Sequence, residues 1–128
     1  MKQATPTPES HLPLTPTVFH ILLALADKER HGYGIIKEIE SRTNGRIRIM
    51  AGTLYGAIKR LLERGLIQET ADRPDPKLDD ERRRYYQLTN FGHRVLTAEV
   101  ARLEEQLRQA HSKQLIPGDN PAQVAVSF

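Results

Sequence analysis

Cysteine and tryptophan are absent from the 128-residue chain, and four tyrosines and three phenylalanines are its only large aromatic residues. Without cysteine, the chain forms neither disulfide bonds nor thiolate metal sites, which fits a reducing compartment. Its longest apolar stretch, residues 18–26, contains His20 and is far shorter than the ~20 residues that cross a membrane. No signal peptide opens the chain. We therefore expect a cytoplasmic protein with no membrane partner, organised as one domain with an appended element.

Motifs that carry out catalysis or bind metal ions are absent as well. The five histidines form no HExxH motif and no pair at i,i+4 spacing. No glycine-rich phosphate loop and no nucleophile–base arrangement is evident. The sequence therefore predicts no catalytic residues, no metal site and no cofactor, and it argues against an enzyme.

The N-terminal residues 1–13 hold three prolines and little apolar content, which predicts a flexible arm. Thr15 followed by Pro16 is typical of an N-cap and a first helical position. The run that follows is apolar almost all round. It predicts a buried first helix that ends near Lys28.

A pair of helices joined by a short turn is predicted next. The second helix is expected over residues 33–43 with isoleucines on one face, and the Asn-Gly pair after it is a stop signal. Residues 46–49 alternate charged residues with isoleucine and form a short strand at most. A third helix follows within residues 50–67, and Gly65 is a plausible stop for it.

The second half of the chain predicts a hairpin and a long helix. Two strand-like segments, residues 66–70 and 83–89, enclose a polar loop with two prolines at residues 71–80. A fourth helix, with the preceding threonine as N-cap, is expected over residues 90–112. Residues 113–128 are predicted to be a flexible tail.

This order of elements predicts a mainly α fold with a small β-hairpin wing. Residues 14–89 fit a winged helix-turn-helix domain that binds DNA. Residues 90–112 fit a C-terminal dimerisation helix appended to it.

The third helix has two different faces. Its apolar stripe consists of Leu54, Ile58, Leu61 and Leu62, which recur at helical spacing. A helix that enters the major groove presents hydrogen-bond donors from its first turns, and it needs small residues where its backbone approaches the duplex. Such residues stand opposite the stripe or beside it: Gly52, Thr53, Tyr55, Gly56, Lys59 and Arg60. A surface helix whose cations are merely solvated is the alternative that periodicity alone leaves open.

Charge is distributed unevenly, although 19 basic and 16 acidic side chains leave a formal net charge of only +3. Residues 42–64 contain six basic residues and one acidic residue, and residues 81–94 contain four arginines and one glutamate. The expected wing tip, residues 72–80, is acidic. A basic stripe along the third helix and the returning wing strand is typical of a DNA-binding face.

The fourth helix carries a possible dimerisation seam. Its apolar residues are spaced 4, 3, 4 and 3 apart, which is the a/d pattern of a short coiled coil. The alternative is a single helix that packs on its own domain. The residues of the seam are Leu96, Val100, Leu103 and Leu107, continued by Ala110.

Three segments read HGYGIIKEI from residue 31, GTLYGAIKRLLERGLI from residue 52 and RRRYYQLTNFGHRVL from residue 82. They resemble the signature blocks of the PadR-like family of winged helix-turn-helix transcriptional regulators. The resemblance covers residues 14–107 and implies a homodimeric repressor that binds double-stranded DNA and has a single C-terminal dimerisation helix. It also allows a small-molecule effector of unknown identity, bound between that helix and the DNA-binding core.

The resemblance also implies particular contacts. It places Thr53, Tyr55 and Lys59 on the recognition helix, Tyr33 at the start of the second helix, and Arg83 and Arg84 on the wing. With two further residues of the helix face, the predicted DNA-binding set is Tyr33, Thr53, Tyr55, Gly56, Lys59, Arg60, Arg83 and Arg84.

The chain departs from the family pattern at two places. Met50 and Ala51 stand where Ser-Pro is usual, so the usual N-cap of the recognition helix is missing. Gly56 stands where proline is usual, and it weakens the helix by roughly 0.5–1 kcal/mol relative to alanine.

Because one recognition helix reads only a few base pairs, a homodimer is expected to read a near-palindromic operator. The rival hypothesis is a winged-helix adaptor that binds another protein and no DNA. An adaptor would keep the seam but would not need the basic stripe.

Overall fold

The protein, described by a computed structural model over residues 6–70 and 84–117, is mainly helical with a small sheet. Its elements in chain order are η1 (Pro8–His11), α1 (Pro16–Ala24), β1 (Arg30–His31), α2 (Gly32–Arg42), α3 (Ala51–Glu63), β2 (Ile67–Glu69), β3 (Tyr85–Leu88) and α4 (Asn90–Ser112). The predicted mainly α fold with a β wing is confirmed. None of the described helices is both long and apolar enough to cross a membrane.

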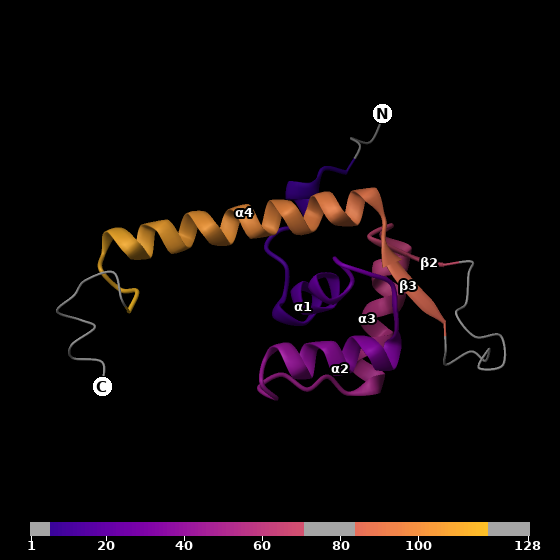
Figure 1. The fold of residues 1–128 in the computed structure, drawn as a ribbon. Coiled ribbons are helices and arrows are strands. Elements are labelled where there is room, and N and C mark those ends of the chain that lie inside the picture. Colours follow the sequence, from indigo (N-terminus) through magenta and orange to yellow (C-terminus); the bar gives the residue numbers. More distant parts are fainter. Residues whose placement is uncertain (1–5, 71–83, 118–128) are drawn as a thin grey trace, which may run out of the picture.

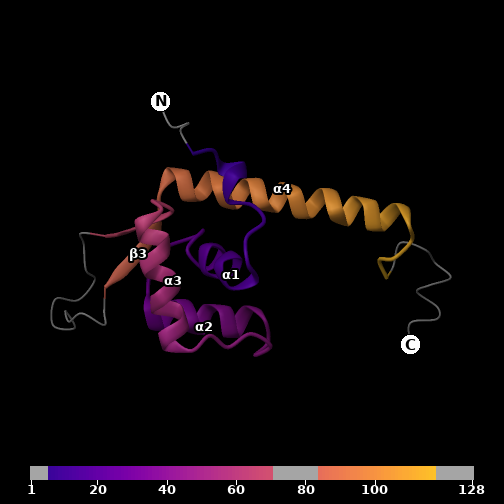
Figure 2. The ribbon, with the colours of Figure 1, turned by 180° about the vertical axis from the view of Figure 1, so that it is seen from behind.

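Figure 1 shows how these elements are layered. The long helix α4 lies along one side, α1 lies beneath it, and α2 lies on the far side of α1. The same order is visible from behind (Figure 2). The strands extend from one end of this stack, and they form one antiparallel sheet in the order β1-β3-β2.

A single apolar core joins α1, α2, α3, the wing strands and the start of α4. Apolar burial drives this packing, at about 25 cal/mol per Å² of apolar surface removed from water. Each of the four α-helices contributes one side to the core. Its largest fully buried apolar side chains are Ile21, Leu22, Ile35, Ile39, Leu54, Leu61, Leu66, Ile67 and Val95.

The helix starts agree with the sequence-based expectations. The Thr15 hydroxyl accepts a hydrogen bond from the Val18 N–H, and the Thr89 hydroxyl accepts one from the Gly92 N–H. Each hydroxyl thus satisfies a free N–H of the first helical turn. At α3, by contrast, Met50 occupies the N-cap position and provides no side-chain cap.

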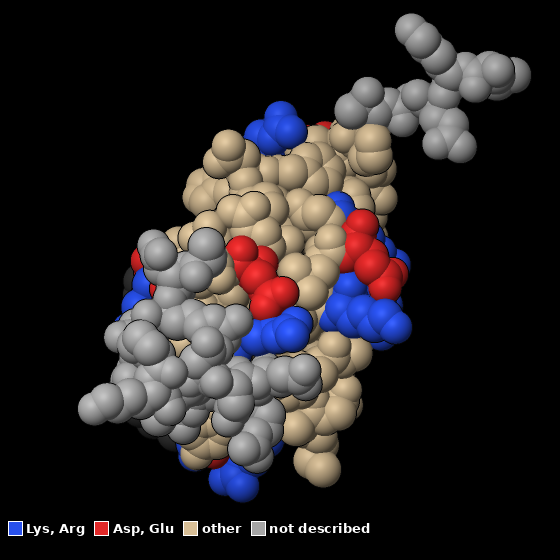
Figure 3. All heavy atoms as spheres, turned by 90° about the vertical axis from the view of Figure 1, so that its right-hand side faces the viewer, with Lys and Arg blue, Asp and Glu red and all other residues tan. Residues whose placement is uncertain are grey.

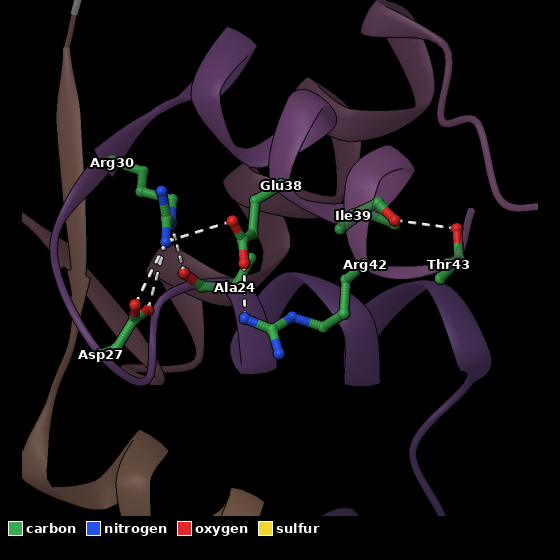
Figure 4. Close-up of polar contacts among 7 residues, drawn as sticks. All are labelled: Ala24, Asp27, Arg30, Glu38, Ile39, Arg42 and Thr43. Carbon is green, nitrogen blue, oxygen red and sulfur yellow. Dashed lines mark hydrogen bonds and ion pairs between the residues drawn. The ribbon is translucent and has the colours of Figure 1, made fainter. Parts of the chain in front are cut away.

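Helix α1 ends at Ala24, four residues before the predicted end near Lys28. The reason is a contact from outside the helix, shown in Figure 4. The Arg30 Nε–H donates to the Ala24 carbonyl oxygen at 2.7 Å, and its guanidinium pairs with Asp27 at 3.3 Å and with Glu38 of α2 at 3.4 Å. The arginine therefore satisfies a terminal carbonyl of α1 and ties that helix end to α2.

Strand β1 was not predicted. It pairs with β3, with Arg30 opposite Tyr86 and His31 opposite Tyr85. The segment 46–49, where a short strand at most was expected, is not a strand. There the Thr43 hydroxyl donates to the Ile39 carbonyl oxygen (Figure 4) and accepts from the Ile47 N–H, so the chain turns directly towards α3.

The segment before α1 also differs in part from the expectation. Within residues 6–13, which were predicted to belong to a flexible arm, η1 packs against α4. The His11 ring meets the Phe91 ring edge-on, with 5.4 Å between the ring centroids. The expected acidic wing tip lies outside the described residues, as do residues 1–5 and 118–128.

Candidate nucleic-acid interface

Helix α3 has one buried apolar face and one exposed polar face, as its apolar periodicity predicted. Leu54, Ala57, Ile58 and Leu61 are buried, and they hold the helix on the core. Four of the predicted DNA-binding residues of this helix are exposed and Gly56 is half-buried. The exposed residues are Thr53, Tyr55, Lys59 and Arg60.

Tyr55 also packs against α2, a contact that the sequence did not predict. Its ring lies against Gly32 at the start of α2, where an added Cβ would come within 2.4 Å of the Tyr55 hydroxyl oxygen. Gly32 is therefore the residue that lets the first turn of α3 approach the first turn of α2. Through this contact, Tyr55 fixes the two helices of the helix-turn-helix unit against each other.

Tyr33, from the predicted set, stands at the start of α2 among other rings. It is 59% exposed, and the His31 ring stacks on it at 6.4 Å between centroids. The Lys37 Nζ lies 5.3 Å from the Tyr33 ring centroid, within the range of a cation–π contact. His31 Nδ1 accepts the Gly34 N–H at 2.9 Å and so caps α2, while the His31 ring meets Tyr85 of β3 edge-on.

The cations differ in how far neighbouring carboxylates neutralise them. Arg84 of the predicted set pairs with Glu69 across the wing at 3.5 Å, and Arg42 pairs with Glu38. Figure 3, which views the wing end, shows acidic and basic side chains next to each other there. Within residues 6–70 and 84–117, neither Lys59 nor Arg60 has an ion pair. Among the described residues of the predicted set, the cations without an ion pair thus lie on α3, and Arg83 is outside the described residues.

Helix α4 is anchored in its first half and projects in its second half (Figure 1). Leu96, which the spacing assigned to the dimerisation seam, is only 6% exposed and belongs to the core of its own protomer. The other three residues of the seam lie on the projecting half and are exposed: Val100 by 45%, Leu103 by 38% and Leu107 by 52%. With Ala110, they line a shallow apolar groove.

A hollow of about 520 Å³ lies where η1, the end of α3 and the start of α4 meet. Its lining includes His11, Arg64, Phe91 and Arg94. The Arg94 guanidinium lies 5.5 Å from the Phe91 ring centroid. Within the described residues, no group of three or more His, Asp or Glu side chains is placed to hold a metal ion.

Comparison with known proteins identifies the family. The model of the transcriptional regulator PadR-like family matches residues 21–98, which is more than half of the chain. The chain belongs to this family. It is therefore a transcriptional regulator and not an enzyme.

A relative by sequence is an uncharacterized protein of Lysinibacillus sphaericus. It is 36% identical over 77 residues, which cover 60% of this chain and 68% of the relative. Among solved structures, a transcriptional regulator from Clostridium thermocellum is similar, with 25% identity and a TM-score of 0.61 over 77% of this chain and 96% of that chain.

Two further similar structures bear the family name. A PadR family regulator from Clostridium difficile R20291 is 26% identical, with a TM-score of 0.59 over 75% of this chain and 95% of that chain. PadR of Bacillus subtilis, solved in complex with operator DNA, is 23% identical, with a TM-score of 0.58 over 69% of this chain and 47% of that chain. At 23% identity, the second likeness shows the fold alone.

The sequence did not indicate the structural roles of three residues in this PadR-like protein, His31, Arg30 and Glu99. Histidine is not among the preferred N-caps, so nothing local indicated that His31 caps α2. Arg30 was expected in a connecting segment, and Glu99 was one of several glutamates on a long helix. Glu99 and His31 each have one partner distant in the sequence, the Leu14 N–H and the Tyr85 ring, which no local pattern predicts.

Proposed function

We propose that this PadR-like protein is a sequence-specific repressor that binds double-stranded DNA as a homodimer. The observation that carries the proposal is the exposed face of α3, where Lys59 and Arg60 have no acidic partner among the described residues. Uncompensated cations on a helix at the protein surface attract phosphates and reach base edges. The operator-bound PadR of Bacillus subtilis, which shares the fold, is consistent with this use of the helix.

Two glycines of α3, the exposed Gly52 and the half-buried Gly56, support the same role. An alanine Cβ at Gly52 would meet no heavy atom within 4 Å, and one at Gly56 would meet only the end of the Arg60 side chain, at 3.7 Å. Both glycines lie inside a helix with negative φ, where glycine is less stable than alanine by roughly 0.5–1 kcal/mol. Packing among the described residues does not require them, whereas close approach of the helix backbone to a duplex would favour them.

The projecting half of α4 supports the homodimer. Val100, Leu103 and Leu107 are apolar and exposed along one face of a helix, and no described part of the protomer covers them. Because each side chain is already about half-buried, covering the rest against a second copy would contribute ~0.7–1.5 kcal/mol per residue, or roughly 4–9 kcal/mol for two chains. Association costs roughly 4–15 kcal/mol, so the seam can hold a dimer when η1 or α1 adds further contact.

Binding to DNA is expected to weaken steeply as salt increases. Each phosphate that a lysine or arginine neutralises releases counterions, with a log–log slope of roughly −0.9 per contact. We expect a slope that corresponds to several phosphates per dimer, measured by fluorescence anisotropy on a labelled duplex between low and moderate salt. A flat response would contradict DNA binding and favour the adaptor hypothesis.

Two substitutions are expected to separate base reading from phosphate contact. Lys59→Ala should cost ~1–3 kcal/mol of binding and relax the preference at one position of each half-site, because a lysine on α3 reaches base edges. Arg84→Ala should weaken all sequences alike and by less, because a wing cation meets phosphate and Glu69 already shares this charge. Binding to a panel of single-base operator variants measures both effects, and identical profiles would contradict the assignment.

The proposal includes release by a small-molecule effector. The hollow between η1, α3 and α4 has about 520 Å³, within the range of ligand pockets, and its lining combines the Phe91 ring with the Arg64 and Arg94 guanidinium groups. A ligand there would contact the recognition helix and the dimerisation helix together. A compound that stabilises the DNA-free protein and releases the duplex would support this part, and Phe91→Ala should remove both effects.

A further inference from the structure

One carboxylate is almost fully buried in the described part of the protein. Glu99 of α4 is 2% exposed, and both of its oxygens accept hydrogen bonds from the Arg102 guanidinium. Its Oε2 also accepts the backbone N–H of Leu14 at 3.0 Å. A buried carboxylate is tolerated only when it is paired and hydrogen-bonded, and this one is. The bonds from Arg102 keep the pKa of Glu99 below its usual value in spite of burial, so the group is charged at neutral pH.

The partners of Glu99 join two parts of the fold that are distant in the sequence. Leu14 immediately precedes Thr15, the N-cap of α1, and α1 packs on α2 in the DNA-binding domain. Glu99 and Arg102 lie on α4. The carboxylate therefore ties the start of α1 to the dimerisation helix.

Glu99 is also the last anchoring residue along α4. The buried residues of this helix are Gly92, Val95, Leu96 and Glu99, and beyond them the side chains are exposed or half-buried. The remaining 13 residues extend about 20 Å at 1.5 Å per residue, so a tilt of about 10° at Glu99 would displace the helix end by roughly 3.5 Å. Because the exposed apolar residues lie on this projecting half, its direction sets how two protomers are related.

We propose that Glu99 is a positioning residue that fixes the angle between α4 and the DNA-binding domain. In a homodimer, this angle determines the distance between the two recognition helices, which must match one duplex turn of ~34–36 Å. Glu99 thus determines which spacing between half-sites the protein accepts. The inference rests on the proposed dimer and its DNA binding, and it adds the residue that sets their geometry.

The helix offers a closely matched control. Glu105 pairs with Arg108 at 2.8 Å, with the same three-residue spacing on the same helix as Glu99 and Arg102. Glu105 is exposed, however, and within the described residues its contacts stay on α4. Glu99→Gln and Glu105→Gln therefore make the same chemical change, but only the first removes charge from the link between α4 and α1.

The first test measures the geometry without DNA. Since the chain has no cysteine, Ser41→Cys introduces one labelling site on an exposed position of α2. Spin-label distances between the two protomers should form one narrow peak in the parent dimer and in Glu105→Gln. In Glu99→Gln we expect the peak to broaden or shift by several ångströms while the protein stays dimeric. An unchanged peak would overturn the inference.

The second test measures the consequence for DNA. The probe is the best duplex selected from random sequences by the parent dimer, together with versions that have one base pair inserted or deleted at the centre. The parent and Glu105→Gln should discriminate against altered spacing by at least tenfold, whereas Glu99→Gln should discriminate less than threefold and keep its salt-dependent, non-specific binding. Retained strict spacing in Glu99→Gln, with only a lower unfolding temperature, would show a merely structural role.

A second variant guards against failure to fold. Arg102→Lys keeps the Leu14 bond and a positive charge beside the buried Glu99 but loses the two-point guanidinium contact, and it changes a side chain that is already about one-third exposed, so it should disturb folding less. It is expected to relax the spacing preference in the same direction, and unchanged discrimination would overturn the inference. If the parent dimer itself selects no duplex, the proposed function fails, whereas a selective parent with an equally selective Glu99→Gln contradicts only the positioning role.

Discussion

Leu103→Glu is expected to convert the protein from a dimer into a monomer and to abolish specific operator binding. Leu103 is the middle residue of the exposed apolar face of α4, with Val100 and Leu107 on either side. In a symmetric seam, the new carboxylate would lie opposite its own copy inside an apolar contact. Desolvating two like charges costs several kcal/mol, which is comparable to the net stability available to so short a seam.

Non-specific DNA binding should survive in this variant because the cations of α3 are unchanged. Sedimentation gives the oligomeric state, and a gel-shift titration on the same preparation gives the affinities for operator and non-operator duplexes. Ala101→Glu is the matched control, since it places the same charge on an exposed position of α4 outside the apolar face. A Leu103→Glu protein that stays dimeric with full operator affinity would show that the dimer is built elsewhere.

Gly92→Ala is expected to destabilise the folded protein by at least ~3 kcal/mol, because overpacking against backbone leaves little room for relaxation. A Cβ at this position would lie 1.9 Å from the Leu66 carbonyl oxygen and 2.8 Å from its carbon. That oxygen already accepts the Thr89 N–H at 3.1 Å. The Thr89 hydroxyl also donates to the Gly65 carbonyl oxygen and accepts from the Gly92 N–H, so the backbone on both sides of the clash is held in place.

Thermal unfolding measures this effect, and a loss of about 3 kcal/mol should lower the midpoint by roughly 12 °C or more for a domain of this size. Gly52→Ala is the control, because its Cβ meets no atom within 4 Å. This control should raise the stability by up to ~1 kcal/mol and, on the proposed function, weaken DNA binding. Equal stability changes in the two variants would contradict the close packing of α4 on the Leu66 backbone between α3 and β2.

Much of this fold is determined by short segments of the sequence, because the interactions responsible are local. Thr15 and Thr89 cap their helices through hydrogen bonds that span only three residues. Gly65 ends α3 with a φ of +74°, a conformation that glycine adopts without strain. The periodicity of α3 alone placed Leu54 inside and Lys59 outside.

The tertiary structure decided those features whose cause lies far along the chain. The heptad spacing could not distinguish Leu96 from Leu103, because the same pattern suits a core face and a dimer seam; only the packing of α4 on the domain separates them. Arg84 was expected to be a free cation for DNA, but it lies just before β3 and pairs with Glu69 of β2.

Helix ends and buried polar groups likewise depend on tertiary contacts that local sequence does not predict. Helix α1 stops at Ala24 because Arg30 and Glu38 meet at its end, and propensity alone carried the predicted helix further. Glu99 is buried on α4, where it accepts the N–H of Leu14, a residue distant in the sequence. Local sequence therefore determined most of the helices and the chemistry of the recognition helix. The tertiary structure decided which charges remain unpaired and how α4 is held, because those depend on residues that only folding brings together.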